Sequence, residues 1–133
     1  MPIPENREQL YAILLKMAQV ISQKLANPIY IAILRIVFAE SGRFPELSEL
    51  FRKTIPRSTG ILINLLRQLI RTGLVHLEED DLDMSMTMFV GPFITHSVFF
   101  SLMSGDQSPE PMPQHALEQL CRLYLDAITE RAS

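Results

Sequence analysis

The chain has 133 residues, 47% of them hydrophobic, so it is long enough to bury a core and is most simply one domain spanning 1–133. Its 12 basic and 15 acidic side chains give a net charge of −3, with no basic stripe of the kind that binds nucleic acid. A single cysteine, Cys121, excludes an internal disulfide, and with no visible signal peptide we expect a cytoplasmic protein. The apolar share is high for a soluble monomer of this size, which favours an oligomer.

The first predicted element is an amphipathic helix over residues 6–26. Its apolar side chains recur every three or four residues, at Leu10, Leu14, Met17, Ile21 and Leu25. Asn27 and Pro28 then end this helix and begin the next, since asparagine caps a helix and proline suits its first turn.

The second predicted helix, residues 28–41, is apolar around nearly its whole circumference and carries one charge within it, Arg35. A helix that is apolar on all sides is usually buried on all sides. We therefore expect it at the centre of the domain. Gly42 is expected to close it in the left-handed conformation that glycine adopts readily.

Two further helices are predicted between Pro45 and Gly73. Pro45 begins the first, which runs to about Lys53, and the prolyl bond in Thr54-Ile55-Pro56 predicts a break. The second runs from Pro56 to Thr72 with a wide apolar face, and Gly73 is its expected left-handed cap, with Leu74 packing back on it.

The remaining sequence predicts a long helix, a loop and a last helix. Asp80 or Asp81 caps a helix that runs to about Met103 and is kinked at Gly91-Pro92. A loop over 104–113 leads to a helix over 114–131, whose apolar stripe is wider than one neighbour within the chain requires. No strand is predicted, so the expected fold is an all-α bundle of about six helices.

The run from Met84 to Gly105 carries no charged side chain. A membrane-spanning helix needs about 20 apolar residues, but serines and threonines interrupt this run and no basic residues flank it. A buried or interfacial helix is therefore favoured over a transmembrane one, and no membrane partner is expected.

The sequence offers no catalytic constellation, so we expect neither an enzyme nor a cofactor. His76, His96 and His115 form no helical metal pair, which leaves no metal site. Cys121 lies on an apolar stripe and is read as a packed thiol rather than a nucleophile. The acidic run over 78–83 lacks the ligand spacing of a calcium loop, and a solvated turn that caps a helix is the better interpretation.

Arg35 and the Met84–Phe93 region each have two readings. A guanidinium in an apolar helix needs a partner, and a structural pair with Glu40 or another acid is favoured over a role in binding an anionic ligand group. Met84, Met88, Phe89 and Phe93 are spaced as core residues, although such side chains beside a Gly-Pro kink also make the deformable wall of an apolar pocket.

The octapeptide Glu40-Ser41-Gly42-Arg43-Phe44-Pro45-Glu46-Leu47, followed by a helix that ends at Gly73, resembles the C-terminal domain of TetR-family transcriptional regulators, and within them the AefR-like subgroup. In such regulators an N-terminal helix-turn-helix domain binds operator DNA. The C-terminal domain binds a small, usually apolar effector and dimerises through a four-helix bundle made by its last two long helices.

The resemblance implies a pocket between the helices over 28–41, 56–72 and 81–103, and a homodimer formed by the helices ending at 103 and 131. The ligand-binding residues expected are Arg35, Phe38, Leu62, Leu66, Met88, Phe89, Phe93 and His96. The dimer-interface residues expected are Phe99, Phe100, Met103, Leu117, Leu120, Cys121, Tyr124 and Ile128.

The expected function is therefore that of a ligand-binding and dimerisation domain of a TetR-like repressor. The effector-domain pattern begins almost at once, so the helix-turn-helix is expected to be missing and the chain is not expected to bind operator DNA alone. The alternative is a helical adaptor that binds other proteins and no small molecule.

Overall fold

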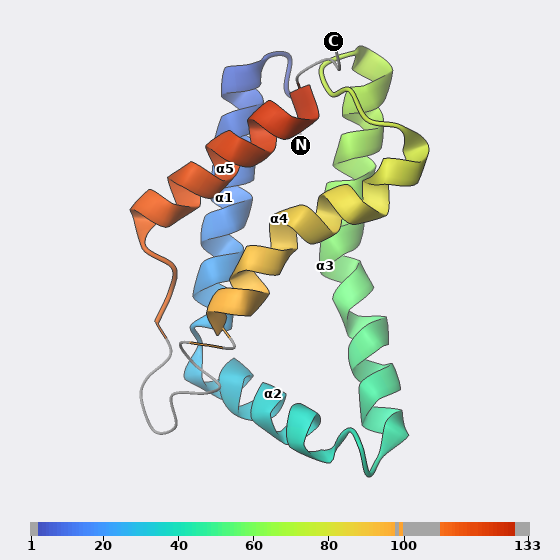
Figure 1. Cartoon of the computed structure of the whole chain (residues 1–133), viewed down its shortest axis with the longest axis vertical. Coiled ribbons are helices and arrows are strands. Elements are labelled where there is room, and N and C mark those ends of the chain that lie inside the picture. Colours follow the sequence, from blue (N-terminus) through green and yellow to red (C-terminus); the bar gives the residue numbers. More distant parts are fainter. Residues whose placement is uncertain (1–2, 98, 100–109, 130–133) are drawn as a thin grey trace.

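The computed structural model describes residues 3–97, 99 and 110–129, without the side chains of residues 48 and 50–59. The described part consists of five α-helices and a short 3-10 turn and contains no strand, which confirms the predicted all-α class. Along the chain these are α1 (Arg7–Leu25), α2 (Pro28–Glu40), α3 (Pro45–Thr72), the 3-10 turn η1 (Glu79–Asp81), α4 (Leu82–Ser97) and α5 (Gln114–Thr129), as Figure 1 shows.

The core lies where α1, the second half of α3, α4 and α5 meet. Helix α1 packs along α5 and also contacts α4, and its Leu10, Leu14 and Ala18 are fully buried. Asn6 caps α1, because its side-chain oxygen accepts a hydrogen bond from the backbone N–H of Gln9 at 2.9 Å. The predicted first helix is therefore confirmed, and it holds the central position.

The prediction that the second helix is the buried centre of the domain is wrong. Only Ile31 and Leu34 of α2 are buried, and Ile29, Ile33 and Ile36 are exposed. The helix lies at the bottom of the view in Figure 1, where it joins α1 to α3 and contacts no other described helix extensively. Its composition predicted burial on all sides, but within the described part of the chain only one side is buried.

The predicted break at Thr54-Ile55-Pro56 is also wrong, since α3 continues without interruption from Pro45 to Thr72. A proline inside a helix removes one hydrogen bond and bends the chain, and this loss need not end the helix. Pro45 is at the predicted start, after which the expected separate helix to Lys53 is simply the first part of α3.

The two glycines expected to end helices behave differently. Gly73 has φ 85° and caps α3 in the left-handed conformation, as predicted. Gly42 does not have a positive φ, because α2 ends in a right-handed turn at Ser41 and the chain passes directly into Arg43 and Phe44. The left-handed cap expected at Gly42 is therefore absent.

The C-terminal end of α5 is fixed to the start of α1 and to the segment after α3. The Arg7 guanidinium donates hydrogen bonds to the Asp126 carboxylate and the Thr129 hydroxyl. The backbone N–H of His76 donates to the carbonyl of Ile128 at 2.8 Å. These contacts bring three segments that are distant in sequence together at the top of Figure 1.

Helices α4 and α5 begin close to the predicted positions. The acidic run forms η1 directly before α4, and α4 passes through Pro92 without interruption. The expected extension of α4 to Met103 and of α5 to Arg131 lies outside the described residues, apart from Phe99.

Candidate functional site

Four of the expected ligand-binding residues lie together in the core. Leu62 and Leu66 of α3 and Phe89 and Phe93 of α4 are all buried in one cluster. The two phenylalanine rings meet edge to face, with their centroids 5.8 Å apart. This arrangement is a packed apolar wall between α3 and α4.

The two expected ligand-binding residues of α2 do not belong to this cluster. Phe38 is exposed, and Arg35 is half-buried. Glu40, considered as a partner of Arg35, approaches Arg43 at 3.8 Å at the end of α2.

The other two expected ligand-binding residues lie on different sides of α4. Met88 is exposed on the outer side, away from Phe89 and Phe93. The half-buried His96 is 3.0 Å from the carbonyl of Glu110 through its Nε2 and thus links the end of α4 to the segment before α5.

Two buried serines that sequence reasoning did not select lie close to the ends of these helices. Ser22 of α1 is buried and accepts a hydrogen bond from the backbone N–H of Met112 at 2.8 Å. Among the described residues, the Ser97 hydroxyl is buried and has no hydrogen-bond partner. Ser97 falls four residues after Phe93 and eight after Phe89, so helical spacing alone places it on the same buried face of α4.

Helices α4 and α5 are joined by a buried polar contact inside an aromatic cluster. The hydroxyl oxygens of Ser85 and Tyr124 lie 2.8 Å apart, and the Tyr124 ring is 5.0 Å from that of Phe89. Burial raises the pKa of Tyr124, and the hydrogen bond to Ser85 acts against this rise. Burial also raises the pKa of the Cys121 thiol to about 11.

Most of the expected dimer-interface residues on α5 are buried within the chain itself. Leu117, Cys121, Tyr124 and Ile128 belong to the core, and Leu120 is partly buried against it. Phe99 is exposed, and Phe100 and Met103 lie outside the described residues. The main apolar stripe of α5 is therefore taken up by α1 and α4.

An exposed apolar surface lies instead on the outer sides of α4 and α5, and we call it the α4–α5 outer surface. It comprises Met84 and Met88 on one side of α4, Phe99 just beyond the end of α4, and Leu123 and Ala127 of α5, all of them exposed. No charged residue lies between Met84 and Phe99. Helical spacing places Thr87 and Thr95 on this side, so it is uncharged along its length.

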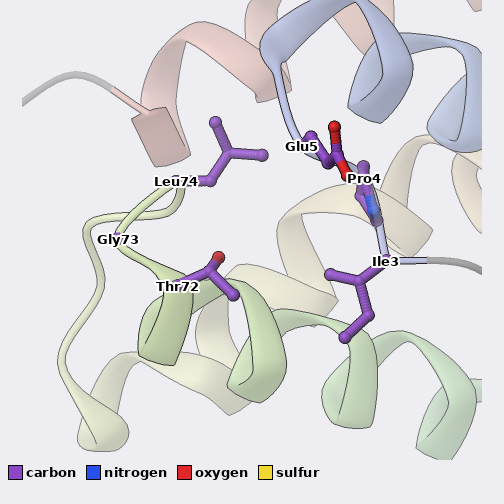
Figure 2. Close-up of a pocket in the computed structure, with 6 residues that line it drawn as sticks. All are labelled: Ile3, Pro4, Glu5, Thr72, Gly73 and Leu74. Carbon is purple, nitrogen blue, oxygen red and sulfur yellow. The ribbon is translucent and has the colours of Figure 1, made fainter.

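Two surface grooves among the described residues lie away from the expected position between α2, α3 and α4. The larger has a volume of about 520 Å³, with Ile3, Pro4 and Glu5 on one side and residues 72–74 on the other, as Figure 2 shows. The smaller lies against α1 and α5, around Arg7, Glu8, Tyr11 and Leu125. Both are open to solvent at the end of the molecule where α1 begins.

Within the described ranges, no group of three or more histidine, cysteine or acidic side chains is placed to hold a metal ion. None of the described helices alone is both long and apolar enough to cross a membrane. Taken together, α1 and α2 are long and apolar enough, but the axes of the two helices are bent by 69° at the break between them.

Comparison with known proteins gives one family match. The family described as "AefR-like transcriptional repressor, C-terminal domain" matches residues 12–127, which extend from within α1 into the last turn of α5. The same comparison finds no match among curated proteins and none among solved structures.

Proposed function

The chain belongs to the TetR family, as the C-terminal domain of an AefR-like transcriptional repressor, and from this membership we propose that it binds a small, mostly apolar effector and forms a homodimer. TetR-family regulators typically dimerise and bind DNA through their N-terminal domain. A C-terminal domain that binds a ligand and pairs with its copy provides the regulatory half of such a protein.

The proposed effector site lies beside the wall formed by Leu62 and Leu66 of α3 and Phe89 and Phe93 of α4. An apolar ligand that pushes these side chains apart would still contact apolar side chains of α3 on one side and of α4 on the other. Ser97 supports this location, because a buried hydroxyl without a partner costs about 1–3 kcal/mol, and a polar atom of a ligand can remove that cost. Arg35, Phe38 and His96 are expected to contribute only if α2 and α4 move towards each other, and Met88, on the outer side of α4, is assigned to the dimer contact instead.

The proposed dimer contact is the α4–α5 outer surface. Because Leu117, Cys121, Tyr124 and Ile128 are already buried, the contact is assigned to the exposed Met84, Met88, Phe99, Leu123 and Ala127, with Leu120 at its edge. The exposed apolar side chains on α4 and α5, with no charge along the α4 side, are the single observation that supports pairing, since such surfaces mark interaction sites.

Native mass spectrometry of the purified chain, first mild and then denaturing, tests both parts together. We expect an assembly built from dimers that carries a small-molecule adduct, and release of the adduct on denaturation. A monomer contradicts the dimer, and an assembly without any adduct, even after incubation with a library of small apolar compounds, favours the adaptor function.

Two variants separate the two parts. Leu123→Glu places a charge in the dimer contact and is expected to halve the mass of the assembly without unfolding the chain. Ser97→Ala removes the unpartnered hydroxyl and is expected to weaken adduct retention while the mass of the protein assembly stays the same. If Leu123→Glu lowered adduct retention and Ser97→Ala lowered the mass of the assembly, Leu123 would belong to the effector site and Ser97 to the dimer contact.

A further inference from the structure

The outward face of α2 is an exposed aliphatic surface. Its three isoleucines, Ile29, Ile33 and Ile36, are 73%, 53% and 60% exposed. Ala32 and Ala39 are exposed between them. The spacings of three and four residues place all five side chains along one side of the helix, as in the seam of a two-helix pair.

This face is separate from every contact described above. Helix α2 uses its opposite side, with Ile31 and Leu34, against the rest of the chain. It also lies at the end of the molecule opposite to α5, as Figure 1 shows. A partner on the outward face of α2 therefore leaves the α4–α5 outer surface free.

We propose that α2 pairs antiparallel with α2 of a second copy of this chain, through a contact that does not depend on the α4–α5 outer surface. The face is self-complementary, as a two-fold contact requires. A two-fold axis between Leu34 and Arg35 places Ile33 opposite Ile36 of the second copy, and Ile36 opposite Ile33. The small side chains of Ala32 and Ala39 let the two helices approach closely.

The charges at the two ends of α2 select the antiparallel orientation. Lys24 lies at the N-terminal end, with its Nζ 5.5 Å from the centre of the Tyr30 ring. Glu40 is the last residue of α2; its side chain is 37% exposed and lies 3.8 Å from the exposed Arg43 guanidinium, and such a long surface ion pair is weak enough to leave Glu40 available to a second cation. The same axis places Glu40 over the first turn of α2 in the second copy, where the helix dipole and Lys24 are both positive. A parallel pair would bring like ends together.

A lipid surface fits this face less well. Helices that lie in a membrane interface combine their apolar side with a strongly basic polar side. In α2 the only basic residue is Arg35, and the helix ends at an acid. Together with the α4–α5 contact, the α2 pair builds assemblies larger than a dimer, of which a tetramer is the smallest closed form.

Sedimentation velocity of the full chain over a concentration series tests the proposal with a matched pair of variants. Ile36→Glu buries two charges near the two-fold axis, and we expect the dissociation constant of the α2 contact to rise by about a hundredfold or more. Ile61→Glu is the control, because Ile61 is 61% exposed on α3 and lies outside the proposed contact. The control is expected to assemble like the wild-type chain.

The results also distinguish this contact from the proposed dimer. A wild-type tetramer that becomes a dimer with Ile36→Glu, and a different dimer with Leu123→Glu, supports both contacts. A wild-type dimer that becomes a monomer with Ile36→Glu, and is unchanged by Leu123→Glu, supports the α2 contact alone. An assembly that Ile36→Glu leaves unchanged, or a wild-type monomer, overturns the α2 contact.

A charge exchange tests the orientation. Lys24→Glu and Glu40→Lys are each expected to weaken the α2 contact about tenfold, and the double variant is expected to restore most of the loss. Additive losses in the double variant would overturn the antiparallel arrangement.

Vesicle binding tests the lipid alternative. If the wild-type chain binds phosphatidylcholine vesicles, and Ile36→Glu abolishes this binding without changing the assembly, the partner of α2 is a lipid surface and the pairing is overturned.

Discussion

At the scale of single residues, the contact between Ser85 and Tyr124 links the two helices that we assign to dimerisation. Their hydroxyl oxygens lie 2.8 Å apart in the core, and the two residues are 39 positions apart in the chain. A buried hydroxyl that is not hydrogen-bonded costs free energy, so each of the two residues depends on the other. This pair therefore fixes how α5 is rotated against α4.

We predict that Tyr124→Phe and Ser85→Ala each lower the free energy of unfolding by about 1–3 kcal/mol, because each leaves the other hydroxyl buried and unpaired. The double variant is expected to cost clearly less than both losses added together. Urea unfolding of the wild type, the two single variants and the double variant, all at one protein concentration, measures this double-mutant cycle. Fully additive losses would show that the two hydroxyls do not depend on each other.

Cys121 gives a prediction for alkaline pH. Burial raises the pKa of its thiol from 9.0 to about 11, so between these values the unfolded chain holds fewer protons than the folded one. The stabilising contribution is complete below pH 9.0 and is lost as the pH rises towards about 11. Tyr124 contributes in the same direction because burial also raises its pKa. We therefore expect the unfolding free energy of the wild-type chain to fall more steeply over this range than that of Cys121→Ala. Parallel pH profiles would show that the thiol is not protected by the fold.

At the scale of elements, the glycines near the ends of α2 and α3 show why one helix stop was predictable and the other was not. At Gly73 the chain must reverse so that Leu74 and Val75 return to the core, and only a left-handed residue allows this turn. After α2 a right-handed turn leads directly into α3, and Gly42 needs no special conformation.

We predict that Gly73→Ala lowers the free energy of unfolding by about 1 kcal/mol, because alanine is strained at φ 85°. Gly42→Ala is the control. A methyl group there meets no atom within 4 Å, and the change is expected to be neutral or stabilising by less than about 1 kcal/mol. Equal losses in the two variants, measured by thermal or urea unfolding, would contradict this difference between the two turns.

At the scale of the whole molecule, the chain is organised around α1. This helix packs against α5, α4 and α2, and its start is bonded to the end of α5 through Arg7, Asp126 and Thr129. Helix α2, the most apolar segment, lies at one end and exposes three isoleucines. The apolar excess of the composition is thus partly on the surface, which supports an assembly of several copies.

A pair of truncations tests this arrangement. Leu14 of α1 is fully buried, and we predict that Leu14→Ala lowers the free energy of unfolding by about 2–5 kcal/mol by leaving a cavity. Ile29→Ala on α2 is expected to cost less than about 0.5 kcal/mol in dilute solution, because its side chain is mostly exposed. A larger loss of unfolding free energy for Ile29→Ala than for Leu14→Ala would show that α2, and not α1, is the central helix.

The sequence by itself determined the helical class, the starts of α1, α2 and α5, the left-handed cap at Gly73 and the family resemblance. These features depend on periodicity, capping residues and short motifs, which act within a few turns of the chain. Spacing also placed Leu62 and Leu66 on an apolar face of one helix and Phe89 and Phe93 at core positions of another, and the family resemblance implied that the two groups meet.

Only the tertiary structure decided which apolar faces are covered. Periodicity shows that a face is apolar but not which helix packs on it. The apolar circumference of α2 therefore predicted a central position, and the resemblance assigned Leu117, Cys121, Tyr124 and Ile128 to a partner. The structure covers the stripe of α5 with α1 and α4 and leaves the outer faces of α2 and α4 exposed. The reason is physical: burial depends on contacts between residues that are far apart in sequence, such as Ser85 with Tyr124, and no local pattern records them.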